Sequence, residues 1–234
     1  MTDSSTVFFA ALEGRLESYD LLKHPYYQAW SKGELTRDDL REYASEYWHH
    51  VSAFPAYLSG LHSHLPDGKL RRLVLENLAD EEGLKSGVPH SDMWMDFARG
   101  MGAEEADVRG RKIGVEMRAL LDHYRATMQG ASPAAALAAL YAYESRVPAI
   151  AKTKAEGLAQ HYSADAATRR YFTVHTVADV HHARVWRDAL AAELAAHPEE
   201  TEAAFAAGED AARALWTALD GVEYARQARM AAAA

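Results

Sequence analysis

The stretch YFTVHTVADVHHAR, Tyr171–Arg184, places three metal-type ligands within one expected helix. Positions four and seven residues beyond the first are turned by roughly 400° and 700° on an α-helix, so His175, Asp179 and His182 share one narrow stripe. Apolar neighbours bury that stripe, and an unpaired buried carboxylate is costly. Two interpretations stay open on this stretch alone. The three residues bind a metal ion, or the histidines are hydrogen-bonded core residues and Asp179 pairs with an arginine such as Arg184.

The rest of the composition limits what kind of protein this is. The 234 residues are 49% hydrophobic and 25% charged, which suits one domain with a substantial core, expected over residues 1–234. A net charge of -9 without a cluster of Lys and Arg argues against nucleic acid as a partner. The absence of cysteine excludes thiolate sites, so His, Asp and Glu must hold any metal. With no leader sequence and no long apolar run, we expect a cytoplasmic protein that does not enter a membrane.

Apolar residues recur at three- and four-residue steps along most of the chain, and no sustained alternation indicates a strand. We therefore expect an all-α, single-domain bundle of seven or eight helices, and the long apolar ones favour a homodimer. A short aromatic helix is expected at 24–30. The longer stretches are 7–22, a helix from Thr36 that kinks at Pro55, 70–81, 90–100, 108–128, a helix from Ser132 that bends at Pro148, 166–196 and 201–230, followed by a frayed tail at 231–234.

Three further residues are candidate ligands. Glu81 continues the apolar stripe of its helix, although the adjacent Glu82 is an alternative. His90 follows the Gly- and Pro-containing break after that helix, and a short helix there can turn it inward. Glu144 lies in the most apolar helix of the chain, where its alternatives are a helix cap or a pair with Arg146. Bundle-core dimetal sites combine carboxylates and histidines from several helices in this way, and such sulfur-free ligands suit Fe or Mn.

Tyrosine is abundant, with twelve in the chain. Core packing accounts for most of them, but a phenol beside an oxidising metal centre is itself oxidisable. Lys154 follows Glu144 by ten residues and is expected to be partly buried. The tyrosines expected to face the bundle interior are Tyr27, Tyr43, Tyr141 and Tyr143.

Five stretches carry a resemblance to a known family. They are SKGELT at Ser31–Thr36, AFPAYLSGLHS at Ala53–Ser63, ENLADEE at Glu76–Glu82, ALYAYESRVPAIA at Ala139–Ala151 and the stretch at Tyr171–Arg184. Together they resemble the chlamydial protein associating with death domains and its bacterial relatives. These belong to the haem-oxygenase-like dimetal oxidases, which are related to proteins of the PqqC and TenA types. The similarity covers nearly the whole chain and offers candidates for all six ligand positions of the family: Glu81, His90, Glu144, His175, Asp179 and His182.

The resemblance implies an unusual activity. The protein would form p-aminobenzoate for folate synthesis, with the aromatic ring taken from its own Tyr27. Tyr43 and Tyr143 would support radical or electron transfer, and Lys154 would donate the amino group. The implied cofactor is a pair of metal ions, Fe/Fe or Fe/Mn, which uses O2 and an external reductant.

Two other functions compete with this one. The same fold can carry a dimetal oxidase that turns over repeatedly on an external amine or fatty substrate. The chain can also be a helical protein-interaction module whose metal site is vestigial, as the name of the family suggests. Metal analysis and the number of turnovers separate these possibilities.

Overall fold

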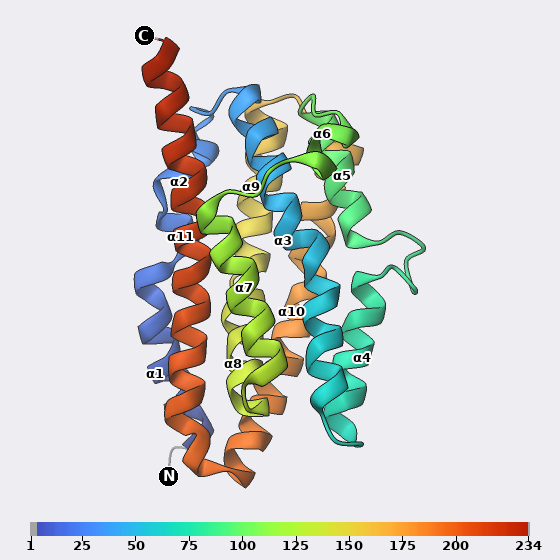
Figure 1. The fold of residues 1–234 in the computed structure, drawn as a ribbon, viewed down its shortest axis with the longest axis vertical. Helices are drawn as coiled ribbons and strands as arrows, with labels where there is room; N and C mark the ends of the chain where they lie inside the picture. Colours follow the sequence, from blue (N-terminus) through green and yellow to red (C-terminus); the bar gives the residue numbers. More distant parts are fainter. Residues whose placement is uncertain (1–3, 234) are drawn as a thin grey trace.

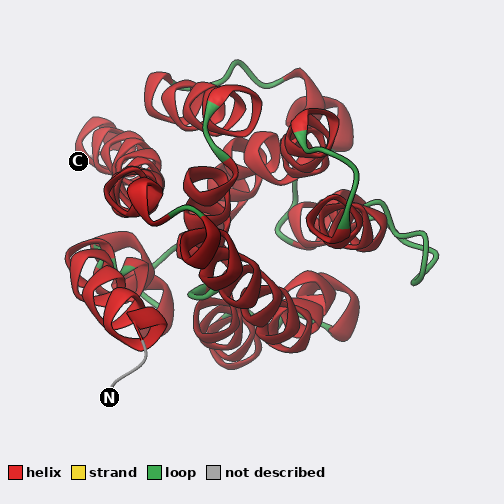
Figure 2. Cartoon of the chain, turned by 90° about the horizontal axis from the view of Figure 1, so that it is seen from below, coloured by secondary structure: helices red, strands yellow, loops and turns green. Residues whose placement is uncertain are grey.

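Helices and loops make up all of residues 4–233, the part of the chain that the computed structural model describes, so the expected all-α class is confirmed (Figures 1 and 2). Three short 3₁₀ turns lie at Glu17–Tyr19, Leu21–Lys23 and Pro198–Glu200. The α-helices are α1 (Ser4–Leu16), α2 (Pro25–Lys32), α3 (Arg37–His64), α4 (Lys69–Glu81), α5 (His90–Gly100), α6 (Glu105–Gly110), α7 (Val115–Gly130), α8 (Pro133–Glu144), α9 (Val147–His161), α10 (Ala166–Ala196) and α11 (Thr201–Ala233).

Residues 4–233 form eleven α-helices rather than the expected seven or eight, partly because two expected helices are each divided in the structure. The stretch 108–128 is split between α6 and α7, because Arg111 pairs with Glu42 and Glu46 and the Gly114 amide also donates to Glu46. These contacts anchor the linker to α3. The helix from Ser132 ends at Glu144, and α9 begins three residues later. Pro148 lies in the first turn of α9, where a missing amide hydrogen costs little, and its ring disfavours a continuous helix past the carbonyl of Glu144.

One other helix end differs from expectation. The first helix ends at Leu16 rather than Leu22, and two 3₁₀ turns follow it. α3 contains Pro55, where a kink is expected, and continues to His64. α11 runs to Ala233, so residues 231–233 of the tail expected to fray are helical, and residue 234 lies outside the described part.

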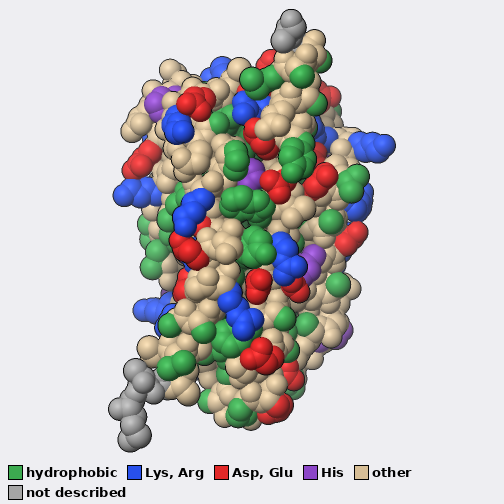
Figure 3. Space-filling view, turned by 90° about the vertical axis from the view of Figure 1, so that its left-hand side faces the viewer, with side chains coloured by type: hydrophobic (Ala, Val, Ile, Leu, Met, Phe, Trp, Pro, Cys, Tyr) green, Lys and Arg blue, Asp and Glu red, His purple; other side chains and the backbone are tan. Residues whose placement is uncertain are grey.

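The helices that carry the candidate ligands converge on α10. This helix packs against α5, α8 and α9, while α3 packs against α4, α5 and α7. The long α11 runs beside α7 and α8 along one side of the bundle, with α1 against it (Figure 1). Acidic and basic side chains are interspersed over the face in Figure 3. None of the helices within residues 4–233 is both long and apolar enough to cross a membrane.

Helix α2 is short but capped at both ends, and this fixes the direction of Tyr27. The His24 side chain accepts a hydrogen bond from the Tyr26 amide, and Pro25 occupies the first turn. Gly33 ends the helix in the left-handed conformation, with φ of 71°. A β-carbon at Gly33 would lie 2.6 Å from Cγ of His161, so the position excludes a side chain for both steric and conformational reasons.

We therefore expect Gly33→Ala to lower the free energy of unfolding by about 1–3 kcal/mol, because alanine is strained at positive φ and collides with His161. Urea denaturation measures the change. Gly14→Ala is the matched control, since Gly14 is an exposed residue of α1 whose added β-carbon meets nothing within 4 Å. It should raise stability by about 0.5–1 kcal/mol. Equal effects of the two substitutions would contradict this account of the α2 terminus.

Candidate metal centre

The six candidate ligands come from four helices, and three of them lie at helix ends. Glu81 is the last residue of α4, His90 the first of α5 and Glu144 the last of α8. The other three project from the middle of α10. All six side chains are buried, none more than 6% exposed. The helix breaks after Glu81 and after Glu144 thus place ligands at the interior of the bundle.

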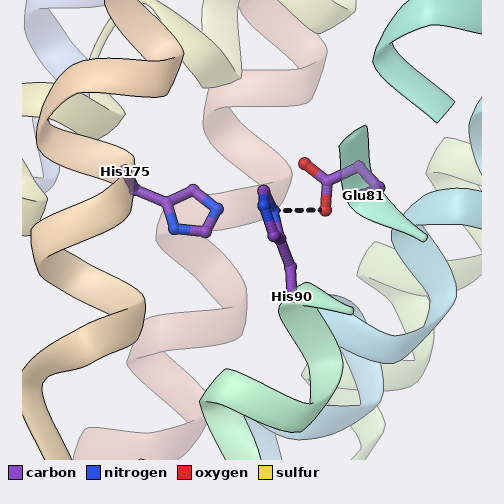
Figure 4. A group of neighbouring side chains, drawn as sticks. All are labelled: Glu81, His90 and His175. Atoms are coloured by element: carbon purple, nitrogen blue, oxygen red, sulfur yellow. Dashed lines mark ion pairs between the residues drawn. The ribbon is translucent and has the colours of Figure 1, made fainter. Parts of the chain in front are cut away.

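Glu81, His90 and His175 form the first group, in which one donor atom from each residue lies within 4.8 Å of the others. Figure 4 shows His90 between the other two, with Nδ1 of His90 3.0 Å from a carboxylate oxygen of Glu81. The rings of His90 and His175 have centroids 4.5 Å apart. Nδ1 of His175 lies 2.7 Å from the carbonyl oxygen of Tyr171, so it carries the proton and leaves Nε2 as the free donor for a metal.

Glu144, Asp179 and His182 form the second group with the same spacing. Nδ1 of His182 lies 3.2 Å from Asp179 and 3.6 Å from Glu144. Neither carboxylate oxygen of Glu144 has a hydrogen-bond partner. A cavity of about 10 Å³ has walls from both groups, which include Glu81, Glu144 and Asp179. The two groups therefore face one space and can hold two neighbouring ions.

The alternative partners considered from the sequence lie elsewhere. Arg184 approaches His181 at 3.4 Å rather than Asp179, and Arg146 pairs with Glu13 rather than Glu144. Glu82 is exposed, whereas Glu81 is buried in the first group. The arginine pairs that would have made this a structural cluster are thus directed to the surface.

Burial and the crowding of charges shift the protonation of the site. Burial alone would lower the pKa of His182, but its hydrogen bond to Asp179 and the charge of Glu144 raise it to about 9. Burial also tends to lower the pKa of His90, but the hydrogen bond to Glu81 and the charge of that residue outweigh burial, so the pKa is raised. Burial raises the pKa of Glu144 well above its ordinary value. Protons therefore balance the carboxylates when no metal is bound, and metal binding releases them.

Two divalent cations fit this set of residues. The carboxylate of Glu144 is buried and accepts no hydrogen bond, and a cation would offset its desolvation. Three carboxylates and three imidazoles without sulfur suit Fe or Mn. Each group supplies three protein ligands, which leaves coordination positions open for a small molecule.

Asp80 is a carboxylate that the sequence did not indicate, and it contacts the ligand His182 from outside the two groups. Asp80 lies 3.4 Å from Nε2 of His182 and 3.0 Å from Nζ of Lys85. This contact turns Nδ1 of His182 toward Asp179 and Glu144, as carboxylates behind metal-bound histidines commonly do. Asp80 precedes Glu81 and lies off the apolar stripe, so periodicity assigns it to solvent, and only its adjacency to a candidate ligand could have drawn attention to it.

The predicted tyrosines and lysine form a second cluster. Nζ of Lys154, on α9, lies 2.7 Å from the hydroxyl of Tyr27 and 2.6 Å from that of Tyr43, and the two hydroxyls are 3.0 Å apart. Lys154 is only 5% exposed, and burial lowers its pKa well below the ordinary 10.5. The amine is thus held without a carboxylate among its hydrogen-bond partners. Tyr141 instead donates to Glu13 on α1.

Tyr143 and Tyr171 separate the lysine cluster from the metal ligands. Both line the 10 Å³ cavity of the metal ligands and a second cavity of about 30 Å³ that Tyr27 and Lys154 also line. The ring centroid of Tyr171 lies 4.0 Å from that of His175. Sequence reasoning overlooked Tyr171, although it stands four residues before His175 on the same stripe. The larger surface groove of about 250 Å³ between α4 and α10 contains none of these residues.

We expect the wild-type chain to bind about two metal ions and His182→Ala about one, because the substitution removes a donor from the second group alone. Elemental analysis after anaerobic loading with iron or manganese measures the content. Metal loading should also raise the melting temperature less for the variant than for the wild type. His181→Ala is the control, since His181 is the exposed neighbour on the same helix. Equal metal loss in both variants would overturn the assignment.

The comparisons with known proteins agree with this geometry. A family model described as an iron-containing redox enzyme matches residues 41–217. A 4-aminobenzoate synthase of Chlamydia muridarum is 39% identical over 179 residues, 76% of this chain and 75% of that protein. Another from Nitrosomonas europaea is 37% identical over 231 residues, 94% of this chain and 92% of that protein.

A solved structure shows the fold. A domain of unknown function with a haem-oxygenase-like fold from Shewanella denitrificans superposes with a TM-score of 0.81 at 18% identity, covering 97% of this chain and 95% of that one. The expected haem-oxygenase-like fold is thereby confirmed. With the family match over most of its length, the chain belongs to the iron-containing redox enzymes.

Proposed function

We propose that the enzyme makes 4-aminobenzoate, which is p-aminobenzoate, for folate synthesis from its own Tyr27 in an O2-dependent reaction. Its curated relatives at 36–39% identity carry the name 4-aminobenzoate synthase. The observation that carries the proposal is the contact between the buried amine of Lys154, which has no carboxylate partner among the described residues, and the phenol of Tyr27. Packing requires no such contact, because an isolated buried amine destabilises the fold.

The ring of Tyr27 already has the substitution pattern of the product. Its oxygen and its β-carbon are para to one another, as are the nitrogen and the carboxyl carbon of 4-aminobenzoate. Nζ of Lys154 lies 2.7 Å from the oxygen and 4.1 Å from the ring centroid. In this reaction Nζ of Lys154 bonds to the ring carbon in place of the phenol oxygen, which leaves as water, and the bond between Nζ and Cε of the lysine breaks. The bond between Cα and Cβ of Tyr27 also breaks, and O2 with the external reductant oxidises Cβ to the carboxylate.

The neighbouring side chains have separate roles in this proposal. Burial lowers the pKa of Lys154, which favours the neutral amine that can act as a nucleophile. Tyr43 holds the amine from the other side at 2.6 Å. Tyr143 stands between the two cavities and is positioned to pass an electron between them. Two ions, Fe/Fe or Fe/Mn, bound by the six ligands would supply the oxidising power of O2, with an external reductant.

The small size of the cavities favours a substrate that belongs to the protein. One water molecule needs about 10–15 Å³ of such space. The cavity beside Tyr27 and Lys154 measures about 30 Å³ and the one beside the metal ligands about 10 Å³. These spaces suit O2 or water. A fatty chain or an external aromatic amine would require the core to open, so repeated turnover on such a substrate is the second candidate.

The proposal includes a cytoplasmic homodimer that acts on small molecules. Support for a partner copy is the exposure of Val177 and Val180, two apolar residues on α10 that are 74% and 60% exposed. Light scattering of the purified chain measures its oligomeric state.

Purified, iron-loaded protein given reductant and O2 should release no more 4-aminobenzoate than one molecule per chain. Tyr27→Phe should release none, because the variant lacks the oxygen that the amine replaces. Tyr26→Phe is the matched control, since Tyr26 is equally buried on α2 but donates its hydroxyl to the carbonyl of Asp39. Product from Tyr27→Phe at the wild-type level, or many turnovers per chain, would exclude self-sacrifice.

Lys154→Met should abolish product formation yet stabilise the fold, because the folded state binds the lysine proton more weakly than the unfolded state. The direction of this stability change follows from the linkage between proton binding and folding. With the folded pKa below 10.5, unfolding takes up a proton, so the lysine destabilises the fold at neutral pH and does so less as the pH rises toward 10.5. The variant should melt a few degrees above the wild type at pH 7, and the difference should narrow by pH 10. A variant less stable than the wild type at both pH values would contradict this.

A further inference from the structure

We propose that Arg146 forms a carboxylate-binding site through which an aromatic acid leaves the enzyme. The inference rests on the proposed function, because that function supplies the acid. The site lines a cavity that also has Leu21 and Tyr143 in its walls, next to the lysine cavity. The proposed ligands of Arg146 are aromatic carboxylates, and Arg146 belongs to neither the metal-ligand groups nor the lysine cluster.

A third cavity, of about 10 Å³, adjoins the cavity of Lys154. The two share three wall residues, Leu21, Tyr143 and Ile150. Arg146 and Tyr19 line the third cavity and not the lysine cavity. A molecule that leaves the lysine cavity between Leu21 and Ile150 therefore meets Arg146 next.

Arg146 has an unused donor at this place. It occupies the break between α8 and α9, and its side chain is 28% exposed. One terminal nitrogen pairs with Glu13, but Nε is buried and has no hydrogen-bond partner. A buried donor without a partner is costly, and a guanidinium matches a carboxylate better than any other common anion-binding side chain. A carboxylate that reaches this cavity when the wall at Leu21 moves would satisfy Nε.

Arg146 is the one charged side chain among the described residues that line this cavity, whose other walls are apolar residues and two tyrosines. Tyr141 donates to Glu13 at 2.7 Å, so the carboxylate that pairs with Arg146 is shared with a phenol. An acid formed in the core is attracted to the guanidinium.

Of the three residues that line both cavities, Leu21 is the one that lies in a 3₁₀ turn. It begins a three-residue 3₁₀ turn, whereas Ile150 lies inside α9. Short 3₁₀ turns have weaker hydrogen-bond geometry than α-helices, so we expect the Leu21 turn to move aside more readily than α9. α2 begins at Pro25, directly after this turn and its His24 cap, and it carries Tyr27. Loss of the Tyr27 ring removes a further wall of the lysine cavity beside Leu21.

Binding to Tyr27→Ala tests the site without turnover, because this variant has room in the cavity and no ring to lose. Calorimetry compares 4-aminobenzoate with 4-aminobenzamide, a neutral molecule of the same shape. We expect the acid to bind at least about tenfold more tightly than the amide. Adding Arg146→Gln should remove the preference, and Arg146→Lys should retain part of it. Adding Glu13→Gln should increase it, because Glu13 competes for the guanidinium.

Arg125→Gln in the same background is the control, since Arg125 is a surface arginine paired with Asp122 on α7. It should leave the preference unchanged. Equal affinity for acid and amide in Tyr27→Ala, or a preference that survives Arg146→Gln, would overturn the proposal, as would failure of both molecules to bind. These outcomes do not depend on whether the intact chain forms 4-aminobenzoate with O2, so failure of the exit site and failure of the proposed function are distinguishable.

Discussion

The burial of three carboxylates at the meeting point of four helices is the constraint on which the structure depends. Glu81, Glu144 and Asp179 are each 6% exposed or less, and no arginine or lysine pairs with them. Their only charge partners among the described residues are the three imidazoles around them. Such a cluster is stable when protons or cations balance it. The breaks at Glu81, His90 and Glu144 therefore make sense as the means of turning ligands inward from helix ends.

A second unfavourable group lies close to the first. Lys154 is buried against two phenols, with aromatic rings and no acid around it. Tyr143 and Tyr171 divide the two clusters, so the candidate metal ligands and the amine of Lys154 are neighbours without direct contact. Strained or costly groups gather where a protein trades stability for chemistry. The division also keeps the amine of Lys154 out of reach of the candidate metal ligands, where it would act as a further ligand.

Much of this site follows from periodicity. The stripe of His175, Asp179 and His182 needs only the geometry of one helix, and Glu81 follows from its place on an apolar stripe. The meeting of these residues with His90 and Glu144 depends on tertiary packing, which one sequence does not contain. Asp80 and Tyr171 were missed because their contacts run between helices or through the backbone. Pro148 was expected to bend one long helix, but the structure has two helices, α8 and α9, with the break before Pro148. Whether a helix continues past a proline depends on tertiary packing, which the sequence does not show. The roles of Tyr27 and Lys154 came from the family resemblance, and the structure adds their contact.

The central claim is that the protein is its own substrate, and the origin of the carbon atoms tests it most directly. Protein grown with ring-¹³C tyrosine, purified, loaded with iron and exposed to O2 in unlabelled buffer gives 4-aminobenzoate for mass analysis. If the ring comes from Tyr27, the product carries six labelled carbons and the peptide that contains Tyr27 loses its ring. Unlabelled 4-aminobenzoate, or a Tyr27 peptide of unchanged mass after product release, would contradict the central claim.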